Sequence, residues 1–484
     1  MKKNNQLDIN RIQNAQAHFN HGMLYLKETN YKNAESEFRK GLSIDPLSIA
    51  LTINLGLSLA KQNKYLQAEK VYNKALKLKP DSLEALINLA DIYKYSKPKI
   101  ARNYLEKALK IQPNNKNALD MCGFTWFMEK KYDQALKYYE AATQIDSNFQ
   151  RALFHKTAVF FMTGEFDIAW KNYITRYGVS GNIGSPVGDK LPFFDGKISN
   201  SSRLLIWTDQ GLGDEILQLG IIKEFIEKFP LNISIIANDR LKGIIKRSLP
   251  RVNFFSLTTN NKKNKYLLSD FSYQAPAISL AVHLKRNLNE SYKDDKYLIP
   301  CEVRTRELRK KYLKVSNNKP LVGISWKSSH PEFGENKSIK LKSFMNKIID
   351  LDCFFINLQY GNYLKELNSL PSKFKSKLYT DTTIDPLGQI DNFASQINAL
   401  DYIITTSNTT AHLSGAIGKE TITLVPKIGP GWLWYWFEER SSSPWYPRLK
   451  VLRQSQNKSW ENALNDTSLE LSNFLKKKAM VTSN

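Results

Sequence analysis

The sequence predicts an α-helical solenoid of repeated hairpins followed by an α/β region with two doubly wound domains. Proline recurs at Pro46, Pro80 and Pro113, and other residues recur in phase with it, which indicates stacked helical hairpins over residues 15–177. Short runs that are apolar on both faces then alternate with helical stretches, a pattern typical of buried parallel strands. Between the two patterns lies 178–200, rich in Gly, Ser and Pro, which we interpret as a linker.

The composition suits a folded, basic protein of several domains. At about 150 residues per domain, 484 residues suggest roughly three domains, and a hydrophobic content of 42% argues against wholesale disorder. Lys and Arg outnumber Asp and Glu by 70 to 46, a net charge of +24 that suits a phosphate-rich partner such as nucleic acid, an anionic membrane surface or a nucleotide. Because the basic residues are spread along the chain, we favour a compositional bias and expect no nucleic-acid partner.

The cysteines and the hydropathy pattern indicate a cytoplasmic protein. The three cysteines lie far apart, with no Cys-x-x-Cys pair, which fits a reducing compartment and argues against a zinc site or disulfide scaffold. They are Cys122, Cys301 and Cys353. The first residues are basic but lack the apolar core of a signal peptide, and no apolar stretch of about 18 residues predicts a membrane span.

Small and aromatic residues stand at fixed positions ahead of each proline. We expect the small residue to let two helices of a hairpin approach closely, the aromatic residue to fill the space against the next hairpin, and the proline to end the second helix. Because one hairpin cannot bury its apolar face alone, neighbouring hairpins should stack into a superhelix. The residues in phase are Gly22, Phe38 and Pro46, then Gly56, Tyr72 and Pro80, then Ala90, Leu105 and Pro113, then Gly123, Tyr139 and Ser147.

This pattern resembles the tetratricopeptide repeat family over 15–177. The resemblance implies a concave surface for peptides or proteins. The alternative is that the array merely supports the domain that follows it.

The α/β region divides into two domains, 201–300 and 320–455, which we expect to face each other across a cleft. The predicted strands are 203–207, 233–238, 321–326, 353–359, 402–406 and 421–426. A charged, helical stretch at 301–319 lies between the domains, and a helix and tail at 456–484 complete the chain. Since ligands bind at the carboxyl ends of parallel strands, the loops that follow these strands are where we expect the chemistry.

The loop after the first strand holds two glycines and an acidic residue. We expect Gly211 and Gly213 to permit a tight turn and the close approach of a ligand to the backbone, with Asp214 at the start of a helix. The alternative is that Asp214 merely complements the helix dipole. The loop matches neither a P-loop nor a Gly-x-Gly-x-x-Gly dinucleotide loop.

Two loops of the second domain are suited to bind phosphate. In the first, Lys327 and Lys337 are placed to neutralise a diphosphate, unless these lysines are simply exposed to solvent. In the second, a polar run precedes a helix, whose hydroxyls and free N–H groups make an anion site, although plain N-capping is the alternative. That run comprises Ser407, Asn408, Thr409 and Thr410. His412, in the first helical turn, is either a packed, hydrogen-bonded histidine or an acid or base.

Two further features are less specific. A group of aromatic residues either lines a sugar or base pocket or packs in the core; it comprises Trp432, Trp434, Trp436, Trp445 and Tyr446. Asp350 and Asp352 form an Asp-x-Asp pair ahead of a strand, at the opposite end of the sheet from the loops above. We interpret this pair as part of a turn and expect no metal site.

Several segments in order resemble bacterial tetratricopeptide-repeat glycosyltransferases related to glycosyltransferase family 9, the heptosyltransferase group. These segments are GEFDIAWKNYITRY, LPFFDGK, LLIWTDQGLGDEI, VGISWKSS, TTSNTTAHLSGAIGKETITLVP and SPWYPRLKVLRQ. The likeness covers about 165–455. It implies a GT-B fold, in which two Rossmann-like domains face a cleft, with the acceptor on the side of the first half and a nucleotide-sugar on the side of the second half.

The resemblance also implies roles for individual residues. Asp214 corresponds to the general base, and Lys327 or Lys337 to the lysine near the donor phosphates. The loop Asn408–Thr410 corresponds to the one that holds the diphosphate. Many relatives have Asp-Thr where this chain has Ser407 followed by Asn, so the donor type is not carried over. Because the family pattern includes the last hairpin, Trp170, Tyr173 and Arg176 are expected to pack against the sheet domain.

The resemblance thus implies an inverting, metal-independent glycosyltransferase, for which we expect no cofactor. The donor would be a nucleotide-diphospho-sugar, and the acceptor a hydroxyl of a glycan or a protein, with a possible protein partner bound by the array. One alternative is a non-catalytic protein-binding module with a degenerate glycosyltransferase-like domain. Another is a basic protein that binds nucleic acid or a membrane surface.

Overall fold

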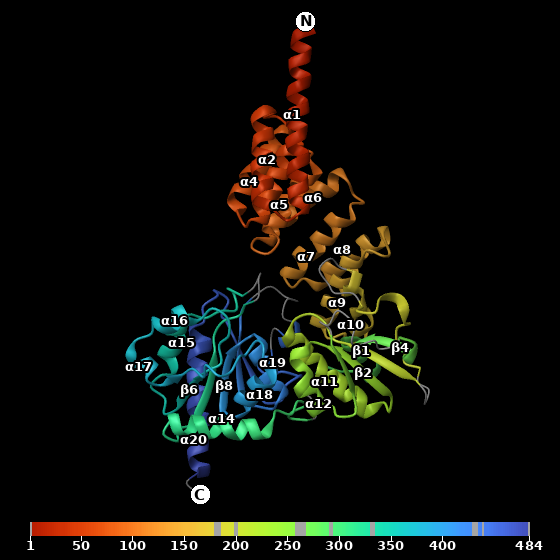
Figure 1. Cartoon of the computed structure of the whole chain (residues 1–484). Coiled ribbons are helices and arrows are strands. Elements are labelled where there is room, and N and C mark those ends of the chain that lie inside the picture. The colour runs from red at the N-terminus through yellow and green to blue at the C-terminus, as the bar shows by residue number, and fades with distance from the viewer. Residues whose placement is uncertain are drawn as a thin grey trace. The chain divides into compact units, whose positions relative to one another are not determined.

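The computed structural model describes residues 2–178, 185–197, 202–256, 268–289, 294–329, 334–427, 434–437 and 440–482 (Figure 1). The chain forms two compact units, Met1–Thr163 and Gly164–Asn484. The first unit is all helical and the second is α/β with two parallel sheets. The unit boundary lies earlier than the end of the predicted array at 177, because the short helix α10 (Phe166–Asn172) belongs to the second unit.

The first unit consists of helical hairpins with short connections (Figure 1). The helices are α1 (Lys2–Lys27), α2 (Tyr31–Ile44), α3 (Ile49–Lys61), α4 (Tyr65–Leu78), α5 (Leu83–Tyr93), α6 (Pro98–Ile111), α7 (Lys116–Met128), α8 (Tyr132–Ile145) and α9 (Gln150–Thr163). Helices α2, α4 and α6 each end two residues before a recurring proline, as the sequence predicts. Helix α8 ends at the same position ahead of Ser147, so the helix can end there without a proline.

The repeated glycines lie against the aromatic ring of their own hairpin. A Cβ atom added at Gly22 would come within 2.4 Å of Phe38, and one at Gly56 within 2.4 Å of Tyr72. The glycines therefore let the two helices of one hairpin approach closely, as predicted. The ring that fills this contact belongs to the same hairpin, and Tyr139 also packs against His155 of the next hairpin, with ring centroids 5.4 Å apart, as expected.

The first sheet of the second unit is parallel, with strand order β3-β2-β1-β4. Its strands are β1 (Arg203–Trp207), β2 (Asn232–Ala237), β3 (Asn253–Ser256) and β4 (Tyr273–Pro276). The helical segments around it are α11 (Leu212–Lys228), α12 (Lys242–Ser248), α13 (Ala281–Leu284), η1 (Tyr173–Gly178), η2 (Gly188–Lys190), η3 (Asp239–Leu241), η4 (Leu268–Asp270) and η5 (Ala277–Leu280). The strand order reverses direction between β1 and β4, next to the loop that leads into α11.

The second sheet is also parallel, with strand order β10-β9-β8-β5-β6-β7. Its strands are β5 (Leu321–Ser325), β6 (Phe354–Asn357), β7 (Leu378–Tyr379), β8 (Tyr402–Thr406), β9 (Thr421–Val425) and β10 (Leu449–Arg453). The helical segments are α14 (Glu302–Val315), α15 (Leu341–Ile348), α16 (Leu364–Asn368), α17 (Ser372–Lys375), α18 (Ile390–Asn398), α19 (Thr409–Ala416), η6 (Trp434–Trp436) and α20 (Glu461–Thr482). This is the doubly wound order, and its switch point lies between β5 and β8.

Each of the six predicted strands is present, with ends that shift by one or two residues. The structure adds β3, β4, β7 and β10, which the sequence analysis missed because they are short or only partly apolar. The predicted helix at 301–319 is α14, and Asp350 and Asp352 lie in the turn between α15 and β6, as expected. Asp352 forms an ion pair with Lys319.

Part of the segment interpreted as a linker packs against the first sheet. Val187 and Leu191 are buried in a cluster with Leu205 and Trp207 of β1. The backbone N–H of Phe194 donates to the carbonyl of Gln274 at 2.8 Å, which extends the edge of the sheet next to β4. Residues 179–184 and 198–200 of this segment lie outside the described residues.

Trp170 of α10 anchors the start of the second unit. Its indole N–H donates to the carbonyl of Arg286 at 3.0 Å, and its ring meets Trp445 edge to face with centroids 6.3 Å apart. Tyr173 is buried beside it. The prediction that Trp170 and Tyr173 pack against the sheet domain is confirmed, whereas the side chain of Arg176 lies outside the described residues.

Candidate functional site

The loops after β1, β5 and β8 meet at the carboxyl ends of the two sheets. Helix α11 follows β1 and packs against α19, which follows β8. The loop after β1 lies next to the switch point of the first sheet, and the loops after β5 and β8 lie next to that of the second sheet. Open α/β sheets bind ligands at such points. The switch points therefore bring the sequence-predicted residues of the two halves to one place.

The turn before α11 does not depend on glycine. The left-handed residue is Gln210, with φ of 68°, whereas Gly211 is extended with φ of −82°. Gly213 lies inside α11, where an added Cβ atom would come within 2.7 Å of Cδ2 of His412. The expectation that both glycines shape a tight turn is therefore corrected: Gly213 instead allows α11 and α19 to approach closely.

Asp214 occupies the first turn of α11. Its Oδ2 accepts a hydrogen bond from the backbone N–H of Gly211 at 3.1 Å, so it does cap the helix. The adjacent Glu215 serves the scaffold instead, because its buried carboxylate accepts from the hydroxyl of Thr208 at 2.6 Å and from the N–H of Asn238 at 3.0 Å. Burial raises the pKa of Glu215.

Lys337 from the second half lies in the electrostatic field of Asp214. It follows β5, is 7% exposed, and its carbonyl accepts a hydrogen bond from the hydroxyl of Thr406 at the end of β8. Burial lowers the pKa of the Lys337 ammonium group, and the negative charge of Asp214 offsets part of that effect. Within the described part of the chain, no carboxylate forms an ion pair with Lys337. The buried ammonium group of Lys337 therefore lies within the electrostatic range of Asp214 without forming an ion pair with it.

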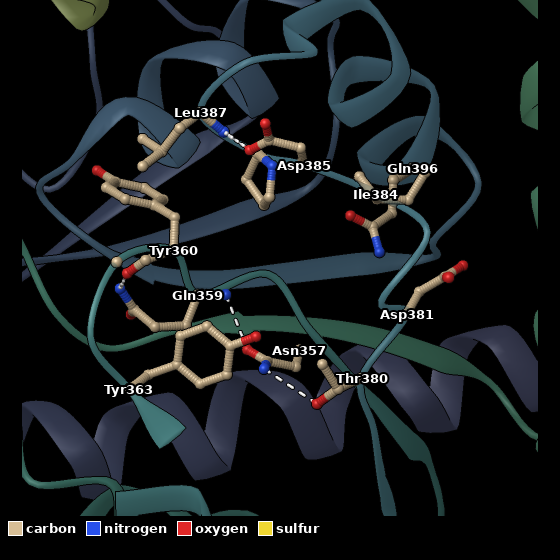
Figure 2. Close-up of a pocket in the computed structure, with 12 residues that line it drawn as sticks. Asn357, Gln359, Tyr360, Tyr363, Thr380, Asp381, Ile384, Asp385, Leu387 and Gln396 are labelled. Carbon is tan, nitrogen blue, oxygen red and sulfur yellow. Dashed lines mark hydrogen bonds between the residues drawn. The ribbon is translucent and has the colours of Figure 1, made fainter. Parts of the chain in front are cut away.

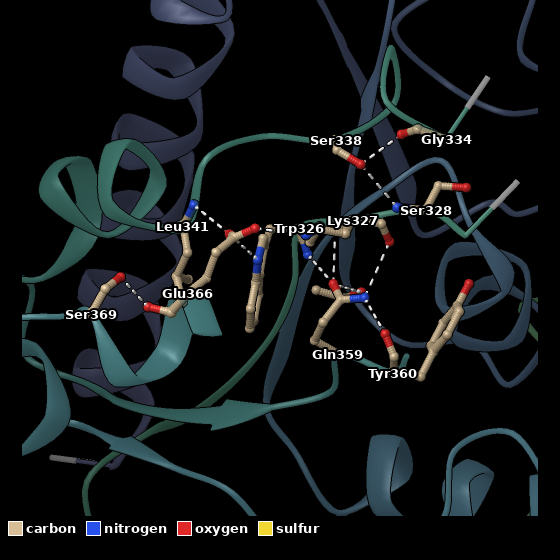
Figure 3. A network of polar contacts seen from close by, with 11 residues as sticks. Trp326, Lys327, Ser328, Gly334, Ser338, Leu341, Gln359, Tyr360, Glu366 and Ser369 are labelled. Atoms are coloured by element: carbon tan, nitrogen blue, oxygen red, sulfur yellow. Dashed lines mark hydrogen bonds and ion pairs between the residues drawn. The ribbon is translucent and has the colours of Figure 1, made fainter. Parts of the chain in front are cut away.

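Lys327, the other predicted phosphate ligand, is engaged elsewhere (Figure 3). Its ammonium group lies 2.7 Å from Oε1 of Glu366. The second oxygen of Glu366 accepts from the indole N–H of Trp326 at 3.0 Å and from the N–H of Leu341 at 3.3 Å. A diphosphate would compete with Glu366 for Lys327, so the geometry favours Lys337 as the lysine that meets an anionic ligand.

Asn408 ties the ends of β5 and β8 together at the start of α19. Its Oδ1 accepts from the N–H of Thr410 at 2.9 Å, and its amide donates to the hydroxyl of Ser325 at 2.9 Å and to the carbonyl of Lys327 at 3.0 Å. The capping alternative therefore describes this residue. The fixed cap holds the α19 N-terminus beside the loop after β5.

The other residues of this run have distinct surroundings. The hydroxyl of Ser407 accepts from the indole N–H of Trp436 at 2.8 Å and is 2% exposed, so it belongs to the aromatic core. Burial raises the pKa of the Tyr360 phenol, and the nearby hydroxyl and backbone N–H of Thr409 offset part of that effect. The hydroxyl of Thr410 is buried and bonds no described residue. The start of α19 thus lies next to the phenol of Tyr360.

His412 is a packed, neutral histidine. Its Nδ1 forms a hydrogen bond of 2.8 Å with the hydroxyl of Tyr446. Burial lowers the pKa of His412 to about 3, and the charge of Lys337 adds to this effect. The residue is 3% exposed, so its surroundings match the packed, hydrogen-bonded alternative.

The predicted aromatic group contributes to the core. Trp436, Trp445 and Tyr446 are at most 2% exposed. Trp432 lies outside the described residues, and so does the side chain of Trp434. The sugar or base pocket considered as an alternative is therefore not formed by the three residues whose side chains are described.

A pocket that no sequence pattern indicated lies at the carboxyl ends of β6 and β7 (Figure 2). Tyr360 and Tyr363 line one side of it, and Gln396 of α18 lies opposite. The other lining residues are Asn357, Gln359, Gly361, Thr380, Asp381, Ile384, Asp385, Pro386 and Leu387. One wall of the pocket follows β7, a strand of two residues that no sequence pattern predicts. The loop after the predicted strand 353–359 forms another wall, and that strand was the available signal for this part of the pocket.

Neither a membrane span nor a metal cluster is found among the described residues. None of the described helices combines the length and the apolar character needed to cross a bilayer. His, Cys, Asp and Glu side chains of the described residues nowhere gather in threes or more in a way that could hold a metal ion.

Comparison with known families identifies the repeats of the first unit. Tetratricopeptide repeat models match residues 15–46 and 47–114. The chain carries tetratricopeptide repeats. This result confirms the predicted family over the first hairpins, while the matched residues stop before the α/β unit.

Similar proteins include a longer curated relative and several solved structures. Protein FlbA of Caulobacter vibrioides is 23% identical over 292 residues, which cover 58% of this chain and 48% of FlbA, so the chain spans about half the length of that relative. Among solved structures, MamA of Desulfovibrio magneticus RS-1 is 17% identical with a TM-score of 0.30, covering 33% of this chain and 92% of that one. Pseudomonas aeruginosa pilF is 20% identical with a TM-score of 0.35, covering 50% and 94%.

Proposed function

We propose that the α/β unit is an inverting GT-B glycosyltransferase that moves a sugar from a nucleotide-diphospho-sugar to an acceptor hydroxyl. The observation that carries this proposal is the close packing of α11, whose first turn holds Asp214, against α19, with the buried Lys337 fixed beside the end of β8. Two parallel sheets with adjacent switch points provide the expected frame. The resemblance of 165–455 to family 9 glycosyltransferases points to the same chemistry.

The geometry supports a division of labour in the transfer step. Asp214 takes the proton of the acceptor hydroxyl while the hydroxyl oxygen forms a bond to the anomeric carbon. The bond from that carbon to the donor phosphate breaks, and its electron pair leaves with the nucleoside diphosphate. Lys337 and the N–H groups at the start of α19 stabilise the charge on that leaving group. Attack opposite to the leaving group inverts the anomeric centre.

The pocket between the loops after β6 and β7 suits the nucleoside part of the donor. It adjoins the start of α19, because Tyr360 lines the pocket while its phenol lies close enough to Thr409 for that residue to affect its pKa. A nucleotide placed there would extend its phosphates toward Thr409 and Lys337.

The test of this proposal compares two carboxylates in adjacent positions. Asp214→Asn keeps an oxygen that can accept from Gly211 but removes the base, so we expect nucleoside diphosphate release from UDP-, GDP- and ADP-sugars to fall about 10²- to 10⁴-fold. Binding of the free nucleoside diphosphate should be retained. Glu215→Gln makes the same chemical change in a scaffold carboxylate and should leave turnover within a few-fold.

The release of nucleoside diphosphate is measured with water and with cell-envelope glycan or protein extracts as acceptors. Equal turnover of Asp214→Asn and wild type would refute the role of Asp214. If the wild type binds none of the nucleoside diphosphates, the glycosyltransferase proposal itself is wrong. A non-catalytic module that binds a protein partner through its tetratricopeptide repeats would then be the better description.

A further inference from the structure

Gln396 in the pocket wall is buried and presents an acceptor that no described residue satisfies. The residue lies in α18, is 1% exposed, and lines the pocket opposite Tyr360 and Tyr363 (Figure 2). Its Oε1 accepts no hydrogen bond from the described residues. A buried acceptor without a donor is unfavourable, and a ligand with a suitable N–H would remove that penalty.

A chain of hydrogen bonds fixes which end of the Gln396 amide faces the pocket. The hydroxyl of Tyr312 donates to Oδ2 of Asp381 at 2.8 Å. Since a phenol has one proton, the Tyr312 oxygen can only accept in its 3.0 Å contact with Gln396, so that contact is made by Nε2. The carbonyl oxygen Oε1 is then directed away from Tyr312.

Asp381 fixes the direction of these hydrogen bonds, which run from Gln396 to Tyr312 and from Tyr312 to Asp381. Lys311 donates to its Oδ1 at 2.8 Å. Burial alone would raise the pKa of Asp381, but the hydrogen bonds from Lys311, Thr383 and Tyr312 outweigh burial and lower it to about 2. An ionised Asp381 can only accept, so the proton of Tyr312 stays committed to it. Tyr312 and Lys311 of α14 thus fix the orientation of the Gln396 amide through their hydrogen bonds.

The neighbouring amide of Asn357 in the same wall is already satisfied. Its Nδ2 donates to the hydroxyl of Thr380 at 3.1 Å, and its Oδ1 accepts from the N–H of Gln359 at 2.8 Å. Gln396 therefore differs from Asn357 in having an acceptor left over for a ligand. The two tyrosines opposite offer aromatic surface to a flat ring.

We propose that Oε1 of Gln396 selects the nucleobase of the donor by accepting a hydrogen bond from an N–H group on the edge of the base. This inference rests on the proposed function, because it assumes that the pocket holds the nucleoside of a nucleotide-diphospho-sugar. The recognised group is an exocyclic amino group or a ring N–H. Gln396 is thus a specificity-determining residue, and a base whose N–H is removed or methylated binds weakly.

Calorimetry on the full chain tests this inference in two steps. First, ADP, CDP, GDP and UDP are titrated to find which binds. The bound diphosphate is then compared with analogues in which its base N–H groups are removed or methylated one at a time, such as purine riboside diphosphate for ADP or N3-methyl-UDP for UDP. In the wild type we expect one analogue to lose about tenfold or more in affinity.

Two glutamines of the same chain segment provide the variant and its matched control. Gln396→Met keeps the shape of the side chain and should reduce the discrimination against that analogue to less than about threefold. Gln389→Met changes an exposed glutamine at the N-cap of α18, outside the pocket, and should leave the discrimination unchanged.

Three results would overturn the inference. A wild type that binds every analogue as well as the natural diphosphate contradicts it without any variant, and leaves the proposed function intact. A Gln396→Met variant that discriminates against the analogue as strongly as the wild type also contradicts the inference. If none of the four diphosphates binds, the proposed function fails, and this inference fails with it.

Discussion

At the scale of single residues, the surroundings of His412 decide its protonation. It stands in the field of Lys337 and is bonded to Tyr446, and burial lowers its pKa to about 3. The sequence placed it in the first turn of a helix but left open whether it packs or reacts. The neighbours that settle the question come from 337 and 446, which no local pattern connects to 412.

The low pKa of His412 predicts an acid-sensitive fold. In the unfolded chain the imidazole gains a proton as the pH falls below 6.5, whereas in the folded chain it stays neutral down to about 3. Protons therefore favour the unfolded state, and the stability that the neutral ring provides above pH 6.5 is lost progressively toward pH 3. We expect this group to reduce the unfolding free energy by about 1–4 kcal/mol over that range.

Denaturant unfolding at several pH values measures this effect. His412→Gln removes the titrating group, so its unfolding free energy should fall less between pH 6.5 and 4 than that of the wild type. Carboxylates titrate in both proteins and cancel in the comparison. Parallel pH profiles for the two proteins would show that His412 does not contribute.

At the scale of elements, close packing of helices depends on glycines that face a ring. Gly213 of α11 meets His412 of α19 in the α/β unit, and Gly56 of α3 meets Tyr72 of α4 in the array. The third repeat has a different pair, Ala90 and Leu105, both fully buried. Alanine, which is larger than glycine, is thus paired with leucine, which is smaller than tyrosine. The two pairs fill a similar space between their helices.

This pairing predicts a double-mutant rescue in the array. Gly56→Ala alone should cost about 1–3 kcal/mol of stability, because the new Cβ atom would lie within 2.4 Å of the Tyr72 ring. In the Tyr72→Leu background the same Gly56→Ala change should cost clearly less, since it recreates the pair of the third repeat. Hydrogen exchange of α3 and α4 measures the unfolding free energies of the wild type, the two single variants and the double variant. If Gly56→Ala lowers stability equally in the wild type and in the Tyr72→Leu variant, the pairing is contradicted.

At the scale of the whole molecule, the chain consists of two compact units with different folds. The first carries tetratricopeptide repeats, and the second brings two parallel sheets together at their switch points. Within the second unit, Arg240 of the first half donates to the carbonyl of Leu387 in the pocket loop at 3.1 Å. A ligand in that pocket is therefore expected to stabilise both halves of the α/β unit.

We predict that a bound nucleoside diphosphate protects the second unit selectively. At a concentration 100-fold above the dissociation constant, mass action adds about 2.7 kcal/mol to the stability of the unit that binds. Hydrogen exchange with and without ADP, CDP, GDP or UDP should then slow across 202–256 and 294–427, while the array serves as the internal control. Protection that is equal in both units, or confined to the array, would contradict this placement of the site.

Periodic and apolar patterns in the sequence predicted most of the fold. The repeat spacing predicted the hairpins around Pro46 and Pro80, and apolar runs predicted β1, β5 and β8, because burial on both faces leaves a local trace in the sequence. Strand β7 left no such trace, since its two residues pair with β6 through the backbone. The pocket beside it was therefore missed as well.

The sequence by itself determined the repeat array, the α/β class and the loops in which candidate site residues stand. The tertiary structure decided which of those residues meet. It set the buried Lys337 in the field of Asp214 and paired Lys327 with Glu366. It also turned the acceptor of Gln396 toward a pocket. Such contacts join residues far apart in the chain, and their energies depend on distance and burial, which no local pattern records.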